Sequence, residues 1–279
     1  MKLTAIEGNT QKLDGGAMFG NAPKALWSRW IEPDELNRIP LACRALLIQS
    51  DGENILLEAG VGAFFEPELR KRYGITEASH CLLDNLAQVG LQHADIDRVI
   101  LSHLHFDHAG GLLSQWQEGE EPSLLFPNAE FIVSSTNWER ARNPHARDRA
   151  SFIKTLNQQL ADSGRLRVIE DEATTLLNGK LRFHFSDGHT PGLMLTEITT
   201  PDGPLVFSAD LIPAAPWVHT AIGMGYDRFP ELLINEKTTL LRDLVARNGR
   251  LFLTHDASHP CVRVTADEKQ RYSGVPCEL

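Results

Sequence analysis

The chain is 279 residues long, which is enough to bury a substantial core in one large domain or two small ones. Its apolar fraction of 42% and charged fraction of 23% are those of an ordinary soluble globular protein. The formal charge of −10 argues against nucleic acid or an anionic membrane as the main partner.

Short apolar runs rich in β-branched residues predict the strands. In chain order these runs are residues 43–49, 53–58, 98–102, 130–134, 180–186, 193–199, 204–209 and 250–254. Several runs end at a polar residue, as strands do when they deliver side chains to a site.

Helical spacing of apolar residues predicts helices over residues 79–89, 150–162 and 231–247. In the last segment we expect one apolar stripe to face the core. It consists of Leu232, Leu233, Leu240, Leu241, Leu244 and Val245. Strands and helices alternate in two halves, before and after about residue 165, which favours an α/β layered fold.

The segment that follows the predicted strand at 98–102 carries the densest chemistry in the chain. His103, His105, Asp107 and His108 form the pattern H-x-H-x-D-H, and Ala109-Gly110-Gly111 reads as a turn into a following helix. In an extended segment His103 and His105 point the same way, and a turn can bring Asp107 and His108 to a neighbouring point. Imidazole and carboxylate together suit zinc, manganese or iron.

Further ligands are expected downstream, because four ligands from one loop cannot complete two metal sites. His189 follows the strand at 180–186, Asp210 ends the strand at 204–209, and His255 ends the strand at 250–254. Strand ends of this kind carry function in α/β folds. The spacing therefore indicates a metal site with ligands from several strand ends.

The four cysteines, Cys43, Cys81, Cys261 and Cys277, contain no C-x-x-C pair, so neither a zinc ribbon nor a redox motif is predicted. Scattered reduced thiols are typical of the cytoplasm. The N-terminus has no apolar signal region, and no apolar run is long enough to span a bilayer. We therefore expect a cytoplasmic protein.

The order of these motifs resembles the metallo-β-lactamase superfamily, whose pattern is H-x-H-x-D-H, a Gly-His turn, a strand-ending Asp and a final His. The resemblance implies an α/β fold, the metallo-β-lactamase αβ/βα four-layer sandwich, as a single hydrolase domain over residues 1–279. It implies a dinuclear site with two Zn²⁺ per chain, manganese or iron remaining open. The expected ligands of the first ion are His103, His105 and His189. Those of the second are Asp107, His108 and His255, with Asp210 bridging.

A narrower resemblance, to the quorum-quenching N-acyl-homoserine lactonase-like branch, covers nearly the whole chain. It is carried by Leu13–Gly20 with Pro23–Trp27, by Leu56–Gly62 and by Gly225–Pro230. It implies a lactonase that acts on a small-molecule lactone or ester through a metal-bridging hydroxide. A homodimer is open. Methyl parathion hydrolase-like enzymes share parts of the pattern.

Two departures from the family pattern concern residues that are not metal ligands. Glu58-Ala59-Gly60 stands where many members have Asp-Thr-Gly, so Glu58 either reaches the site by its longer arm or does not reach it. Leu193 stands where many lactonases have a second His after the Thr-Pro-Gly turn. The metal assignment is unaffected, whereas the lactonase assignment is weakened.

Two residues are candidates for catalysis. Asp107 would pass a proton to the leaving alkoxide, and Tyr226 would contact the oxyanion or the leaving group, packing on a loop being its alternative. Asp227, Asp256 and His259 are expected to be structural. Core packing and substrate contact explain equally well the apolar residues Met18, Phe19, Trp27, Trp30 and Trp217.

Other activities remain open at this stage. The same ligands would serve a phosphotriesterase or a thioesterase of glyoxalase II type. Flavodiiron-type oxidoreductases usually have Glu at the position of His105 and carry a flavin domain, for which this chain has no room. A non-catalytic metal-binding protein is disfavoured because no ligand of the set is replaced.

Overall fold

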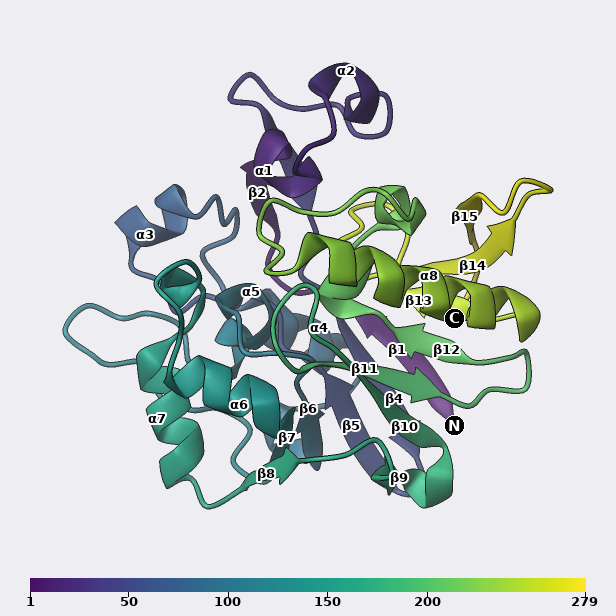
Figure 1. The fold of residues 1–279 in the computed structure, drawn as a ribbon. Coiled ribbons are helices and arrows are strands. Elements are labelled where there is room, and N and C mark those ends of the chain that lie inside the picture. Colours follow the sequence, from purple (N-terminus) through teal and green to yellow (C-terminus); the bar gives the residue numbers. More distant parts are fainter. The chain divides into compact units, whose positions relative to one another are not determined.

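The computed structural model describes residues 1–279, whose contacts divide into two compact units (Figure 1). Unit 1 comprises residues 1–11 and 42–170, and unit 2 comprises residues 12–41 and 171–279. The boundary after residue 170 lies close to the predicted one near residue 165, but the excursion of residues 12–41 into unit 2 was not expected. That the whole chain is one domain stays a prediction.

Unit 1 contains a mixed six-stranded sheet in the order β1-β4-β5-β6-β7-β8. The antiparallel strands are β1 (Lys2–Ile6), β4 (Ala45–Ser50) and β5 (Glu53–Leu57). The sheet continues in parallel from β5 through β6 (Arg98–Ile100), β7 (Glu130–Ser134) and β8 (Leu166–Ile169). Parallel strands deliver their carboxyl ends to one edge, so the residues after β5 and β6 lie side by side there.

The helices of unit 1 are α3 (Pro67–Arg72), α4 (Cys81–Gln88), α5 (Phe106–Ala109), α6 (Ser135–Arg142) and α7 (Lys154–Asp162). Leu82 and Leu86 of α4, and Leu156 and Leu160 of α7, are buried in one core with the strand side chains. The i to i+4 spacing of each pair places both on the same face of its helix.

Unit 2 contains a seven-stranded sheet in the order β15-β14-β13-β12-β11-β10-β9. Its strands are β9 (Thr175–Leu176), β10 (Leu181–Ser186), β11 (Leu193–Ile198), β12 (Leu205–Phe207), β13 (Arg250–Phe252), β14 (Cys261–Ala266) and β15 (Tyr272–Pro276). Only β12 and β13 are parallel. Their carboxyl ends therefore reach the same edge, just before Asp210 and His255.

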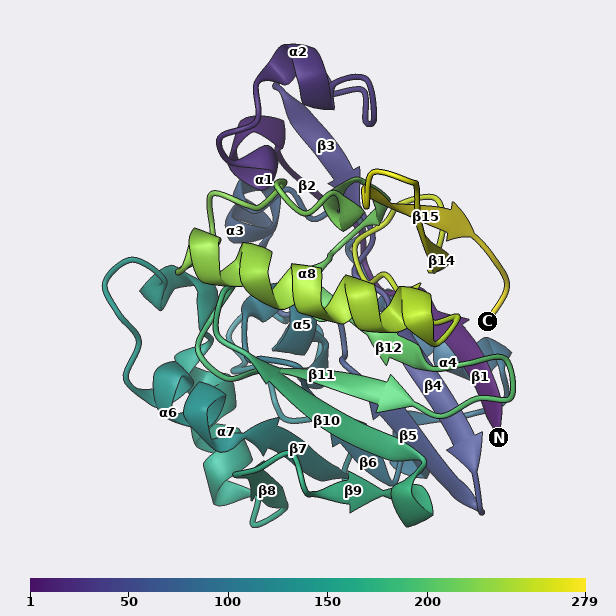
Figure 2. The same ribbon diagram turned by 45° about the vertical axis from the view of Figure 1, so that its right-hand side comes forward.

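Helix α8 (Pro230–Ala246) runs along a face of this sheet (Figure 2). Leu233, Leu241 and Leu244 of the predicted stripe are buried, whereas Leu232 and Val245 are exposed, so the stripe is narrower than expected. The helix also buries Lys237, whose Nζ donates to the carbonyls of His219 and Ile222 at 2.9 and 2.6 Å. Burial lowers the pKa of Lys237 to about 7.

The N-terminal excursion forms α1 (Gly15–Phe19), α2 (Lys24–Trp27) and a small sheet of β2 (Gln11–Asp14) with β3 (Arg38–Leu41). Phe19 stacks on Trp27 and on Trp217, with ring centroids 5.2 and 4.3 Å apart. These three rings are almost completely buried, so we assign them to the core of unit 2. None of the helices of either unit is long and apolar enough to cross a membrane.

Each strand predicted from the sequence is confirmed to within a few residues, as are the three predicted helices. The structure adds short helices and peripheral strands that the periodicity did not reveal. One local expectation was wrong: Ala109-Gly110-Gly111 does not lead into a helix. Asp107 and His108 themselves lie in the short α5, and residues 110–112 form a single 3₁₀ turn.

Candidate metal centre

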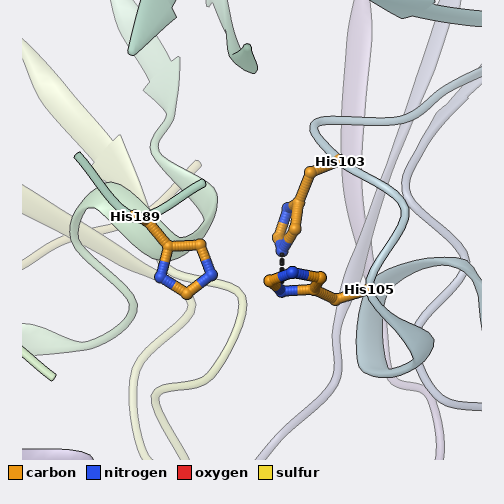
Figure 3. Close-up of side chains that lie close together, drawn as sticks. All are labelled: His103, His105 and His189. Carbon is orange, nitrogen blue, oxygen red and sulfur yellow. Dashed lines mark hydrogen bonds between the residues drawn. The ribbon is translucent and has the colours of Figure 1, made fainter. Parts of the chain in front are cut away.

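The H-x-H-x-D-H segment of unit 1 brings its donors together at the carboxyl end of β6. Nε2 of His103 lies 3.0 Å from Nδ1 of His105, a contact drawn as a dashed line in Figure 3, in which His189 is drawn as well. Nε2 of His108 lies 3.7 Å from Oδ2 of Asp107. The three imidazoles are buried, whereas Asp107 keeps some exposure. The four predicted residues of this half therefore form one cluster.

Glu58 stands at the end of β5 and orients two of these histidines. Its Oε1 accepts a hydrogen bond from Ser102 Oγ, and Ser102 Oγ lies 2.9 Å from Nδ1 of His103. Its Oε2 lies 2.9 Å from Nδ1 of His108. With the serine hydroxyl donating to Glu58, Nδ1–H of His103 donates to the serine, so both rings present Nε2 as the ligand atom. The longer arm of Glu58 does reach the site.

Close backbone approach explains the glycines after the motif. A Cβ on Gly111 would lie 2.0 Å from the carbonyl oxygen of Ala59, and one on Gly110 would lie 2.4 Å from that of Val61. The absence of these side chains lets the turn after α5 pack directly on residues 59–61. Leu104 N also donates to the buried Oδ1 of Asn137 at 3.0 Å, which fixes the backbone between the first two histidines.

Unit 2 assembles a second cluster around Asp210. Oδ2 of Asp210 lies 3.2 Å from Nε2 of His189, and Oδ1 lies 3.2 Å from Nε2 of His255. All three side chains are buried. Asp210 follows β12, His255 follows the parallel β13, and His189 follows β10, so strand ends bring together residues that are far apart in the sequence. The carboxylate thus turns one oxygen towards each histidine.

Two acidic residues hold the turn that carries His189. Nδ1 of His189 donates to Oδ1 of Asp227 at 2.9 Å, and Asp227 is 1% exposed. Glu236 of α8 accepts from Ser186 Oγ at 2.7 Å and from the backbone N–H groups of Asp187 and Gly188 at 2.9 and 3.1 Å. Sequence reasoning missed the orienting role of Asp227, because its partner lies in a distant segment. Glu236 gave no signal at all.

The donor geometry of each cluster fits a transition-metal ion. Zinc bonds of about 2.0–2.1 Å in a tetrahedral arrangement separate neighbouring donor atoms by roughly 3.3 Å. The corresponding separations in this structure are 3.0 Å for His103 to His105, 3.7 Å for Asp107 to His108, and 3.2 Å for Asp210 to each of its histidines. Imidazoles whose remaining nitrogen is held by a carboxylate or hydroxyl are typical of metal ligands. Both clusters are therefore suited to hold metal.

The other residues singled out from the sequence lie within unit 2. Tyr226 is 40% exposed, on the loop that is anchored by the hydrogen bond from Gly225 N to Ala17 O, 2.8 Å long. Asp256 accepts from the N–H groups of Ala215, Ser258 and His259, which agrees with a structural role. Of the five apolar residues for which core packing and substrate contact were both open, only Trp30 is appreciably exposed, at 36%, and it stacks on His219.

Two mixed sheets carry histidine and carboxylate clusters at the ends of their strands, an arrangement that suits a metal-dependent hydrolase. Residues 38–255 match the sequence pattern of the family described as the Metallo-beta-lactamase superfamily. The chain belongs to this superfamily, and the predicted fold class is confirmed.

Similar proteins include curated lactonases and solved hydrolases. An N-acyl homoserine lactonase of Bacillus sp is 26% identical over 193 residues, which cover 64% of this chain and 67% of that protein. The crystal structure of a probable metal-dependent hydrolase from Staphylococcus aureus is 26% identical and covers 100% of this chain and 97% of that one, with a TM-score of 0.88.

A third similar protein shares the fold at lower identity. AidC, a dizinc quorum-quenching lactonase in complex with a product N-hexanoyl-L-homoserine, is 21% identical with a TM-score of 0.79, covering 99% of this chain and 94% of that one. The chain spans only 59 to 67% of the length of the first curated relatives. Substrate and detailed activity therefore belong to the proposal below.

Proposed function

We propose that this protein is a dinuclear metal-dependent lactonase that hydrolyses N-acyl-homoserine lactones or closely related lactones and esters. The observation that carries the proposal is that the two carboxylate oxygens of Asp210 contact different histidines. One oxygen lies 3.2 Å from Nε2 of His189, and the other lies 3.2 Å from Nε2 of His255. A carboxylate that serves a single ion has no need of two imidazoles on opposite oxygens. The arrangement is the one that a bridging ligand requires.

The proposed ligand sets combine the two clusters. His103, His105 and His189 would hold the first ion. Asp107, His108 and His255 would hold the second, and Asp210 would be shared by the two sets. Support comes from the contacts within each cluster and from the chain order of the motifs in the superfamily. Each ion would then have three ligands of its own plus the shared carboxylate, so solvent or substrate would enter as a fifth ligand.

The ions, when bound, supply Lewis acidity that polarises the scissile carbonyl and acidifies nearby water. The chain supplies the rest. Glu58 and Asp227 fix the ring orientation of their histidines, so that donor atoms are in place before substrate arrives. Asp107 is more exposed than the buried imidazoles, which suits a carboxylate that passes a proton to the leaving alkoxide. Tyr226, also exposed, is proposed to contact the oxyanion or the leaving group.

The choice of a lactone over other esters rests on similarity. The curated relatives are N-acyl homoserine lactonases, and one lactonase of the same fold carries the hydrolysed product. The sequence segments around α1 and around Tyr226 also resemble that branch. Because Phe19, Trp27 and Trp217 are buried in the core, the apolar contacts of an acyl chain would come from other residues.

A parallel assay of the metal-loaded enzyme tests the proposal. We expect kcat/KM for at least one N-acyl-homoserine lactone to exceed that for paraoxon, aryl esters and S-lactoylglutathione. Elemental analysis of the same preparation should give about two ions per chain. A higher kcat/KM on the phosphotriester or the thioester would move the protein to that activity. A stoichiometry near one after zinc or manganese loading would refute the dinuclear centre.

A further inference from the structure

Two cysteines that belong to neither metal cluster, Cys261 and Cys277, lie against each other in unit 2. Cys261 is the first residue of β14, and Cys277 directly follows β15. The register pairs Val262 with Pro276, so Cys261 and Cys277 are opposite each other one step further along the same ladder. Their Sγ atoms are 3.4 Å apart, and Cys277 N donates to the carbonyl of Cys261 at 3.1 Å.

This placement matches the backbone geometry of a disulfide. Residues of a hydrogen-bonded antiparallel pair have Cα atoms about 5.5 Å apart. Disulfides connect Cα atoms separated by roughly 4.4–6.8 Å, most often near 5.5–6 Å. Because the two sulfur atoms are already in contact, closing the bond requires side-chain rotation without any change of register.

The two thiols differ in their surroundings. Cys261 is 1% exposed, and burial beside Cys277 raises its pKa to about 12. Cys277 is only partly buried, so it is the thiol that a dissolved reagent can reach. An accessible thiol next to a buried one reacts in a fixed order. The accessible thiol reacts first with a dissolved disulfide, and the buried thiol then displaces the dissolved group to form the intramolecular bond.

We propose that Cys261 and Cys277 are a modification site that forms an intramolecular disulfide by thiol–disulfide exchange with a small-molecule disulfide such as oxidised glutathione. The thiolate of Cys277 attacks one sulfur of glutathione disulfide, breaking its S–S bond and releasing one glutathione thiolate. That thiolate takes the proton of Cys261. The resulting Cys261 thiolate attacks the Cys277 sulfur of the mixed disulfide and releases the second glutathione. Two protein thiols are oxidised and one glutathione disulfide is reduced.

The bond would tie the last residues of the chain to β14, the strand next to the β15 edge of the unit 2 sheet. β14 pairs with both β13 and β15, and Arg250 of β13 already donates to the carbonyl of Glu278 at 3.0 Å. Closing the loop between residues 261 and 277 restricts the unfolded chain, and closure of loops of this size stabilises proteins. The expected effect is on stability and not on the chemistry of the metal clusters.

The test is oxidation of the reduced, metal-loaded protein with glutathione disulfide, followed by alkylation and mass spectrometry of peptides. We expect Cys43 and Cys81 to remain alkylatable after unfolding, and the peptides of Cys261 and Cys277 to be joined with the loss of two hydrogen atoms. Tm of the oxidised form should rise by about 5 °C or more. Addition of dithiothreitol should reverse both changes.

Variants separate an ordered pair from unrelated thiols. Cys261→Ser should accumulate a stable glutathione adduct on Cys277, and Cys277→Ser should take up no glutathione at Cys261. Cys81→Ser, which alters another partly buried thiol, should form the crosslink as the wild type does. Persistence of the glutathione adduct on Cys277 in the wild-type protein, or alkylation of both thiols after oxidation, would overturn the proposal even if a variant failed to fold.

Discussion

At the scale of single residues, Asp210 is the side chain on which the proposed reaction depends most. We expect Asp210→Ala to remain folded and to lose hydrolysis by roughly 100- to 1,000-fold or more, because the variant lacks the carboxylate proposed to bridge the two ions. The value of kcat measures the loss of hydrolysis, and the circular dichroism spectrum measures whether the variant stays folded. Asp202→Ala, at an exposed turn, is the matched control and should behave as wild type. Near-normal kcat in a folded Asp210→Ala protein would refute the bridging role.

The Asp227 carboxylate holds the N–H of His189 at Nδ1 through a hydrogen bond. In Asp227→Asn the amide oxygen can still accept from Met224 N, which donates to Asp227 at 2.6 Å in the native protein. The amide nitrogen then faces Nδ1 of His189, so the proton of that ring moves to Nε2, the ligand atom. We expect zinc affinity to fall about 10- to 100-fold. Competition with a zinc-binding dye measures the zinc affinity, and Asp202→Asn is the control. Unchanged affinity in Asp227→Asn would show that the carboxylate does not orient the His189 ring.

Residue types, spacing and the resemblance in motif order nominated seven candidate ligands, and their assignment to metal stays a prediction. The residues behind them were harder to predict. Glu58 was noticed only as a departure from a family pattern, and its reach became clear from its contacts with Ser102 and His108. Asp227 was assigned a structural role, because nothing in its own segment indicates a partner 38 residues away.

At the scale of elements, the predicted strands are those with continuous apolar runs, such as β4 and β11, whose side chains are buried on both faces. The strands that the sequence did not reveal are largely peripheral. β8 has exposed Arg167 and Val168, and β15 is mostly exposed, so neither has the apolar run on which a strand prediction depends. Helices of four to six residues, such as α1 and α3, are too short for a 3.6-residue period to emerge.

A charged network connects α8 to the unit 2 sheet, and it predicts a pH dependence. The Glu197 carboxylate of β11 accepts hydrogen bonds from Nη1 and Nη2 of Arg247, each 2.8 Å long. It also lies 3.2 Å from Nε2 of His184. Arg247, and then His184, lower the pKa of Glu197 from 4.5 to about 2. A depressed carboxyl pKa gives stability that is present above the unfolded value and is lost as the pH falls from 4.5 towards 2.

Glu197→Gln tests this assignment. We expect the variant to be less stable at pH 7 by about 1–2 kcal/mol, a modest value because solvent screens the 40% exposed Arg247. The difference from wild type should shrink as the pH is lowered through the window between 4.5 and 2. Urea unfolding at several pH values measures it, and Glu268→Gln, at an exposed position, is the control. A difference that does not depend on pH would contradict the ion-pair explanation.

At the scale of the whole molecule, each unit carries part of the proposed ligand set. Bound metal should therefore raise the free energy of unfolding of the whole chain. A ligand present at about 1,000 times its Kd stabilises the folded state by roughly 4 kcal/mol, which for a chain of this size raises Tm by about 10 °C. We therefore expect chelation to lower Tm by about that amount and zinc to restore it. The shift should be smaller in Asp210→Ala. Equal Tm values for the stripped and loaded wild-type protein would contradict the prediction.

The discontinuity of unit 2 has a consequence for biosynthesis. A ribosome delivers Phe19 early and Trp217, on which it stacks, about ten to forty seconds later at ordinary elongation rates. Meanwhile residues 42–170 emerge, and β4 can pair with β1 across the waiting segment. Until Trp217 is made, the nascent chain thus exposes the apolar ring of Phe19 beside unit 1 as that unit folds. Exposed apolar surface of this kind is what chaperones bind. The speed of translation between Phe19 and Trp217 therefore sets how long that loop stays exposed to misassembly.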